Sequence, residues 1–148
     1  MKVSEILKVK GNILFTVTPE TLMLQAVNTM AEKDMGSLVV MEGGAIKGML
    51  TFREVMKAIH GNGGSVGNAK VRSHMDTDPI TITPDLDINE VRRLMLEGHA
   101  RYVPVVEKNT LMGVISFYDV AKAVFETQSY ENKMLKAYIQ DWPEQVDE

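Results

Sequence analysis

Short apolar runs separated by polar turns recur along this chain and predict a protein of mixed helices and strands. Residues 101–120 read RYVPVVEKNTLMGVISFYDV. The apolar run, polar turn and second apolar run in this stretch predict two buried strands joined by a turn. A hydroxyl and a carboxylate, Ser116 and Asp119, follow where the second strand gives way to a helix.

The same pattern occurs twice, at a constant offset. A glycine, a hydroxyl residue and an acid appear as Gly-x-x-Thr-x-x-Glu over 48–54 and as Gly-x-x-Ser-x-x-Asp over 113–119. Two Thr-Pro pairs, at 18–19 and 83–84, repeat with the same offset as these two motifs. The chain therefore contains an internal repeat, and the fold must be built from two similar units.

Each copy predicts a helix, a strand, a helix, two strands and a helix. In the first copy, Val3, Ile6 and Leu7 share one helical face. Thr18-Pro19-Glu20 is expected to start the second helix, because threonine caps helix N-termini and proline suits the first helical position. The expected elements are a helix within 1–10, a strand at 13–17, a helix from 18 to about 33, strands at 37–41 and 46–50, and a helix at 53–60.

The second copy repeats this order. Thr83-Pro84-Asp85 is expected to start its main helix, and Ile88, Val91 and Met95 have the spacing of a core-facing stripe. Short strands mixed with helices in this way indicate an α/β fold. The other expected elements are a start at 71–75, a strand at 80–82, the strand pair within 102–115 and a helix from about 119.

A glycine-rich stretch at 61–68 separates the copies. It is interpreted as a flexible linker, because it lacks the Lys-Ser/Thr ending of a phosphate-binding loop. We expect the two copies to pack face to face through their sheets, since about 60 residues bury little core alone. The predicted division is a first repeat (1–61), a linker (62–70), a second repeat (71–126) and a C-terminal helix with its tail (127–148).

The C-terminal segment carries an apolar face of its own. Met134, Leu135, Tyr138, Ile139 and Trp142 recur at helical spacing. Such a stripe must be covered, either by the module itself or by a second subunit.

Composition and the absence of certain motifs exclude several classes of function. A net charge of −4 over 148 residues argues against nucleic-acid binding, which basic surfaces drive. The absence of cysteine excludes thiol chemistry and fits a reducing, cytoplasmic setting. Neither a membrane span nor a signal peptide is expected from the hydropathy pattern. No nucleophile motif, catalytic acid pair or histidine spacing for a metal is found, which favours a sensor over an enzyme.

The repeated hydroxyl and acid are the candidate chemistry. A carboxylate such as Asp119 can accept hydrogen bonds from both neighbouring hydroxyls of a ribose. The competing interpretation is that Ser116 and Asp119 cap the helix that begins there, and the two roles are compatible. Arg53 and Arg101 could each bind a phosphate, or be solvated surface residues. Pro104 within a strand implies an edge or a locally unpaired amide that could read an adenine edge.

The order of these motifs, repeated twice, resembles the CBS-domain pair, or Bateman module. The resemblance covers residues 1–126, and the chain is similar to small stand-alone bacterial members with no catalytic domain. It implies two tandem repeats with pseudo-two-fold symmetry plus a C-terminal helix. It also implies that adenine nucleotides (AMP, ADP or ATP, and in some members NAD or S-adenosylmethionine) bind in two clefts between the copies.

The resemblance assigns residues to each cleft. One is implied to hold Ser116 and Asp119, with Thr18, Gly36 and Ser37 opposite. The other is implied to hold Thr51, Arg53 and Glu54, with Thr83, Arg101 and Tyr102 opposite. Glu54 departs from the family's usual aspartate, and its longer side chain puts that cleft in question.

The function expected from these features is a non-catalytic regulatory module that binds an adenine nucleotide, AMP first, as an energy or ligand sensor in signal transduction. A homodimer and an unidentified downstream protein are the expected partners. The alternative is a structural or oligomerisation module whose nucleotide sites are degenerate.

Overall fold

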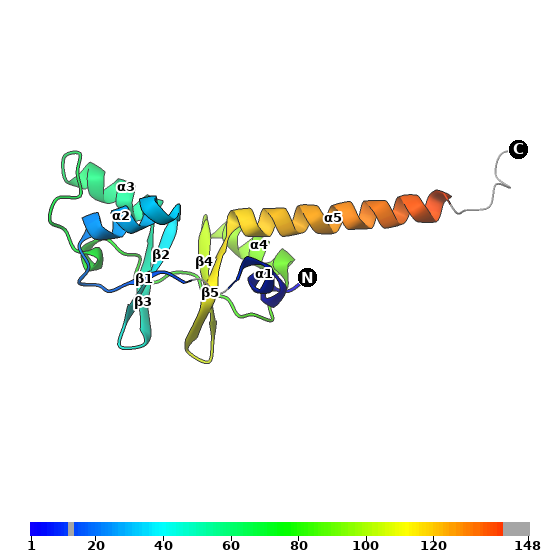
Figure 1. Cartoon of the computed structure of the whole chain (residues 1–148), viewed down its shortest axis with the longest axis horizontal. Coiled ribbons are helices and arrows are strands. Elements are labelled where there is room, and N and C mark those ends of the chain that lie inside the picture. Colours follow the sequence, from blue (N-terminus) through cyan, green and yellow to red (C-terminus); the bar gives the residue numbers. More distant parts are fainter. Residues whose placement is uncertain (12–13, 141–148) are drawn as a thin grey trace, which may run out of the picture.

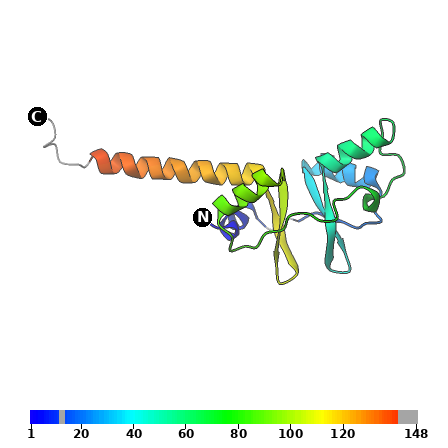
Figure 2. The same ribbon diagram turned by 180° about the vertical axis from the view of Figure 1, so that it is seen from behind.

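The computed structural model describes residues 1–11 and 14–140, which form two lobes and one long projecting helix (Figure 1). The strands of both lobes lie beside each other at the centre, with helices on the outer sides. The view from behind shows the same arrangement (Figure 2). The elements are α1 (Val3–Lys10), β1 (Thr16–Val17), α2 (Met23–Lys33), β2 (Ser37–Glu42), β3 (Ala45–Thr51), α3 (Phe52–Gly61), a 3-10 turn η1 (Val71–Ser73), α4 (Ile88–Glu97), β4 (Tyr102–Glu107), β5 (Thr110–Ser116) and α5 (Phe117–Gln140).

The two sheets share one plan. In the first lobe β1 pairs in parallel with β2, and β2 pairs antiparallel with β3. In the second lobe β4 pairs antiparallel with β5. The register shifts after Val40 in one hairpin and after Val105 in the other, which are equivalent positions of the two copies. The expected α/β fold with tandem repeats packed through their sheets is therefore confirmed.

Each lobe has its own apolar core, and each core borrows a segment from the other half of the sequence. Helix α1 belongs to the first copy by sequence, but Val3, Ile6 and Leu7 are buried in the core of the second lobe. Val71, at the start of the second copy, is buried in the core of the first lobe. The exchange locks the repeats together, because neither lobe closes its core without chain from the other copy.

Backbone hydrogen bonds hold the exchanged segments in equivalent places. Val3 donates its N–H to the Leu86 carbonyl at 3.0 Å, and Val71 donates to the Thr21 carbonyl at 2.8 Å. Thr21 and Leu86 themselves occupy equivalent positions of the two copies. Sequence periodicity predicted α1 but could not show this exchange.

The Thr-Pro pairs do not start helices, and this expectation is wrong. Helix α2 begins at Met23 and α4 at Ile88, more than a helical turn after each threonine. Thr18 and Thr83 instead open tight turns, because their carbonyls accept the N–H groups of Thr21 and Leu86. Proline suits the second position of such a turn as well as the first turn of a helix. The exchanged segments bind both proline carbonyls: Pro84 accepts from Ser4, and Pro19 accepts from Arg72.

Other boundaries also differ from expectation. The predicted strand over 80–82 is reduced to a single parallel bridge between Ile82 and Val105. The strand expected from residue 13 covers only β1, and Ile13 lies outside the described residues. The last helix of the second repeat and the predicted tail helix are one continuous helix, α5, while Trp142 lies outside the described residues. Within 1–11 and 14–140, no helix is long and apolar enough to cross a membrane.

Candidate functional site

A cleft of about 460 Å³ opens between the lobes on the α1 side. Gly36 and Ser37, at the start of β2, form part of one wall. Ser116 and Phe117, at the junction of β5 and α5, form part of the opposite wall. The expected pairing of the first copy's middle strand with the second copy's closing motif is therefore present in the geometry.

Asp119, in the first turn of α5, is not a lining residue of this cleft, but it bonds to two that are, Ser116 and Lys10. Its Oδ2 accepts the Ser116 N–H at 2.9 Å, and its own N–H donates to Ser116 Oγ at 3.1 Å. The helix-capping interpretation is thus correct for both residues. Oδ2 also accepts from Lys10 Nζ at 2.7 Å. No hydrogen bond to Asp119 Oδ1 is found among the described residues, so that oxygen remains able to accept from a ligand hydroxyl.

A second cleft of about 670 Å³ lies on the α3 side. Thr51, Arg53 and Glu54 line it from the first copy, and Arg101 and Tyr102 line it from the second. All the residues assigned to this cleft except Thr83 are therefore brought together. Arg101 and Tyr102 also line the first cleft, so they lie between the two.

Glu54 is folded back onto Thr51. Its Oε1 accepts the Thr51 N–H at 2.8 Å and the Thr51 hydroxyl at 2.7 Å, while Thr51 Oγ1 accepts the Arg53 N–H at 3.2 Å. The extra methylene lets one carboxylate oxygen reach both groups of Thr51. In contrast to Ser116, whose hydroxyl accepts from Asp119, the Thr51 hydroxyl donates to the acid, so its single proton is already used.

Glycines admit the close packing around the clefts. A Cβ on Gly36 would meet the Tyr102 hydroxyl at 1.7 Å, so this position must stay small while Tyr102 reaches across from β4. A Cβ on Gly48 would meet the Asp76 carbonyl oxygen at 2.3 Å, and one on Gly113 would meet Leu7 Cδ2 at 2.7 Å. The glycine of each repeated motif therefore lets a segment from elsewhere in the chain lie against the strand.

Besides Asp119, three residues assigned to the clefts from the sequence line neither of them. Thr18 and Thr83 are exposed in the turns described above, and Pro104 is buried within β4. The Thr83 hydroxyl donates to Asp85 at 2.6 Å and lowers the pKa of that carboxyl. The Pro104 carbonyl accepts the Ile82 N–H at 3.1 Å, so β4 is paired on both sides at this point. Contact of these three residues with a ligand remains a prediction without geometric support.

The structure adds Asp34 and Lys10, which sequence reasoning missed, and His99, which the sequence suggested as a possible donor beside Arg101 but more readily as a lone exposed histidine. Asp34 lines the first cleft and His99 lines the second. Both have left-handed backbone, with φ of 53° and 51°, and they occupy equivalent positions of the two copies. Applying the repeat offset to His99 would have found Asp34. No such signal existed for Lys10, because it enters the first cleft from the exchanged helix α1.

These features define a class: a tandem-repeat α/β module with two pseudo-symmetric clefts between its repeats. The family model for the CBS domain matches residues 3–61 and again residues 71–126. The chain therefore belongs to the CBS-domain family, and it carries two copies of the domain.

Similar proteins support this assignment. The mitochondrial CBS domain-containing protein CBSX3 of Arabidopsis thaliana is 31% identical over 148 residues, covering 93% of this chain and 71% of that protein. Among solved structures, a CBS-domain protein of Agrobacterium tumefaciens is 30% identical with a TM-score of 0.79, covering 83% of this chain and 98% of its own. A protein with CBS domains from Burkholderia ambifaria is 30% identical with a TM-score of 0.81, covering 86% and 96%.

More distant structures share the fold and were solved with ligands. The CBS domain pair of protein MJ0100, 19% identical with a TM-score of 0.76, is in complex with 5′-methylthioadenosine and S-adenosyl-L-methionine. CBSX2, 21% identical with a TM-score of 0.65, is in complex with AMP. At these identities the likeness to this chain concerns the fold.

Proposed function

We propose that this chain is a non-catalytic regulatory module that binds adenine nucleotides in the two clefts between its CBS repeats. The observation that carries the proposal is the pairing of each closing motif with the middle strand of the other repeat. A ligand in either cleft contacts both copies, so its binding energy depends on how the copies are arranged. The AMP, S-adenosylmethionine and methylthioadenosine complexes of proteins with this fold support an adenosine ligand.

The proposed ribose contact in the first cleft is Asp119. Its Oδ1 has no partner in the described structure, while Oδ2 is held by Ser116 and Lys10. An oriented carboxylate loses little conformational freedom when it binds a hydroxyl pair. Ser37, buried on the opposite wall, and Arg101, exposed at the cleft, are the proposed contacts to the rest of the nucleotide.

The test is isothermal titration calorimetry of ligand-stripped protein with AMP, ADP, ATP, NAD and S-adenosylmethionine. Micromolar binding of any one, with no turnover of the ligand, is the expected result. The stoichiometry reports whether the cleft with Glu54 is filled. Absence of heat and of thermal stabilisation with all five ligands would refute the proposal.

Asp119→Ala should weaken nucleotide binding roughly ten- to a hundredfold, because charge-assisted hydrogen bonds contribute about 1.5–3 kcal/mol each. Asp87→Ala is the matched control, since Asp87 also caps a helix, whereas, unlike Asp119, it bonds to no described residue that lines either cleft. Equal weakening in both variants would show that Asp119 acts through helix capping alone.

A second candidate is an oligomerisation module, favoured by the exposed apolar face on the projecting half of α5. Met134, Leu135 and Ile139 are each more than half exposed. Dimer formation that depends on this face, in a protein that binds none of the five ligands, would favour this candidate. Oligomerisation that depends on bound nucleotide would instead show that the protein combines nucleotide binding with assembly.

A further inference from the structure

Lys10 makes the two clefts chemically different. It is the last residue of α1 and lines the first cleft. Its Nζ lies 2.7 Å from Asp119 Oδ2 and donates to the Val114 carbonyl at 2.8 Å. The ammonium group thus lies against the strand and the carboxylate that close this cleft.

In the second cleft, the strand carbonyl equivalent to that of Val114 has a different hydrogen-bond partner. Val114 and Met49 are equivalent positions of the two copies. The Met49 carbonyl accepts the backbone N–H of Asp76 at 2.8 Å, and the Met49 N–H donates to the Asp76 carbonyl at 2.9 Å. A main-chain bridge therefore occupies the site that the lysine ammonium takes in the first cleft. The residue that makes this bridge, Asp76, is an acid that lines the second cleft.

The charges around each cleft follow the same asymmetry. The described lining of the first cleft holds two cations, Lys10 and Arg101, and one acid, Asp34. The described lining of the second cleft contains no lysine, and its charged members are two arginines and three acids: Arg53, Arg101, Glu54, Asp76 and Asp78. Counted with Asp119, which pairs with Lys10, the charges at the first cleft balance, whereas those at the second sum to one excess negative charge. A phosphate is therefore less disfavoured electrostatically at the first cleft than at the second.

On the basis of the proposed nucleotide-binding function, we propose that Lys10 divides the ligands between the clefts by charge. The first cleft takes the 5′-phosphorylated nucleoside, and the second takes adenosine derivatives that carry no phosphate. An ammonium group has three N–H donors, of which two are used by Val114 and Asp119. The third remains for a phosphate oxygen, and Asp119 Oδ1 remains for the ribose hydroxyls.

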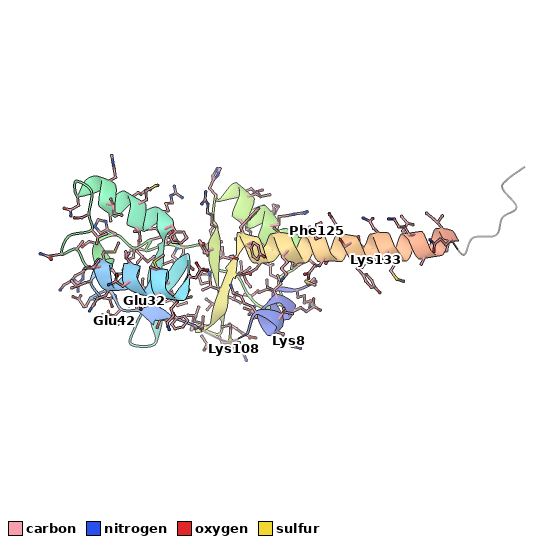
Figure 3. All side chains as sticks on the ribbon, turned by 45° about the horizontal axis from the view of Figure 1, so that its top comes forward. Lys8, Glu32, Glu42, Lys108, Phe125 and Lys133 are labelled. Carbon is pink, nitrogen blue, oxygen red and sulfur yellow. The ribbon has the colours of Figure 1, made fainter. Side chains whose placement is uncertain are left out.

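The experiment compares AMP with adenosine, because the two ligands differ only by the phosphate. Their dissociation constants are measured by calorimetry for the wild type, Lys10→Met and Lys8→Met. Lys8 is the matched control, since it is an exposed lysine of the same helix and lines neither cleft (Figure 3). Amide chemical shifts of Val114 and Asp76 in two-dimensional NMR spectra report which cleft each ligand enters.

The expected result is that Lys10→Met weakens AMP binding at the first cleft roughly ten- to a hundredfold while adenosine binding changes little. Lys8→Met leaves both affinities unchanged, and Lys10→Arg retains the preference for AMP. Asp76→Asn, which keeps an acceptor for the Asp78 N–H, increases AMP binding at the second cleft.

The possible negative results distinguish a failure of the Lys10 inference from a failure of the proposed function. If Lys10→Met weakens AMP and adenosine binding by the same factor, or leaves the ratio of their dissociation constants as in the wild type, Lys10 does not select for the phosphate. The inference is then overturned, and the proposed function still stands. If the wild type binds neither AMP nor adenosine, this inference fails, and the proposed function fails with it only if ADP, ATP, NAD and S-adenosylmethionine also do not bind. AMP that perturbs Asp76 before Val114 would reverse the assignment of the clefts and overturn the inference.

Discussion

Single residues show how the repeat was adapted at each cleft. Gly48 and Gly113 occupy the same motif position, but a Cβ would meet a backbone oxygen at Gly48 and the end of a leucine side chain at Gly113. A leucine side chain can rotate away from an added Cβ, but a backbone oxygen cannot. Gly48→Ala should therefore lower the free energy of unfolding, measured by urea titration, by roughly 1–3 kcal/mol, and Gly113→Ala should lower it clearly less. Gly61→Ala, with no atom in reach of its Cβ, is the control and should be neutral or slightly stabilising. A larger loss for Gly113→Ala would contradict this packing argument.

At the scale of elements, the exchanged segments decide how stability is shared. Val3 and Val71 are both fully buried, each in the lobe opposite to its own copy. Truncating either to alanine should cost roughly 2 kcal/mol, by the loss of two buried methyl groups and the cavity left. Hydrogen exchange should accelerate most in the second lobe for Val3→Ala and in the first lobe for Val71→Ala. The reverse pattern would show that the segments stabilise their own copies.

At the scale of the whole molecule, α5 extends well beyond the second lobe, and Figure 3 places Phe125 and Lys133 along it. Its buried face, with Val120 and Ala123, continues at helical spacing into the exposed Met134 and Tyr138. Truncation after residue 127, which removes residues 128–148, should therefore reduce the number of subunits per particle in analytical ultracentrifugation without changing nucleotide affinity. Lys133→Ala, on the projecting half, is the control. Unchanged assembly after truncation would exclude this face as an interface.

The sequence by itself determined the repeat, the order of elements and most of the cleft residues. Apolar periodicity depends on neighbours within one element, so the strand pair of each copy and the core-facing stripe of α4 were predicted correctly. The repeat offset also predicted, without any distances, that Thr51 and Ser116 are equivalent, and each lines one of the two clefts. The family assignment rests on the same repeated order and is confirmed by two matches to the family model.

Only the tertiary structure decided the rest. The Thr-Pro pairs fit both a helix start and a turn locally, and the turn is selected because Pro19 and Pro84 carbonyls bind the exchanged segments. Lys10 is far from Asp119 in the chain, and nothing in local periodicity links them. Their ion pair exists because α1 buries its apolar face in the second lobe, which carries its last residue to the cleft. Local patterns specify elements, whereas contacts between distant segments decide which charges meet in a site.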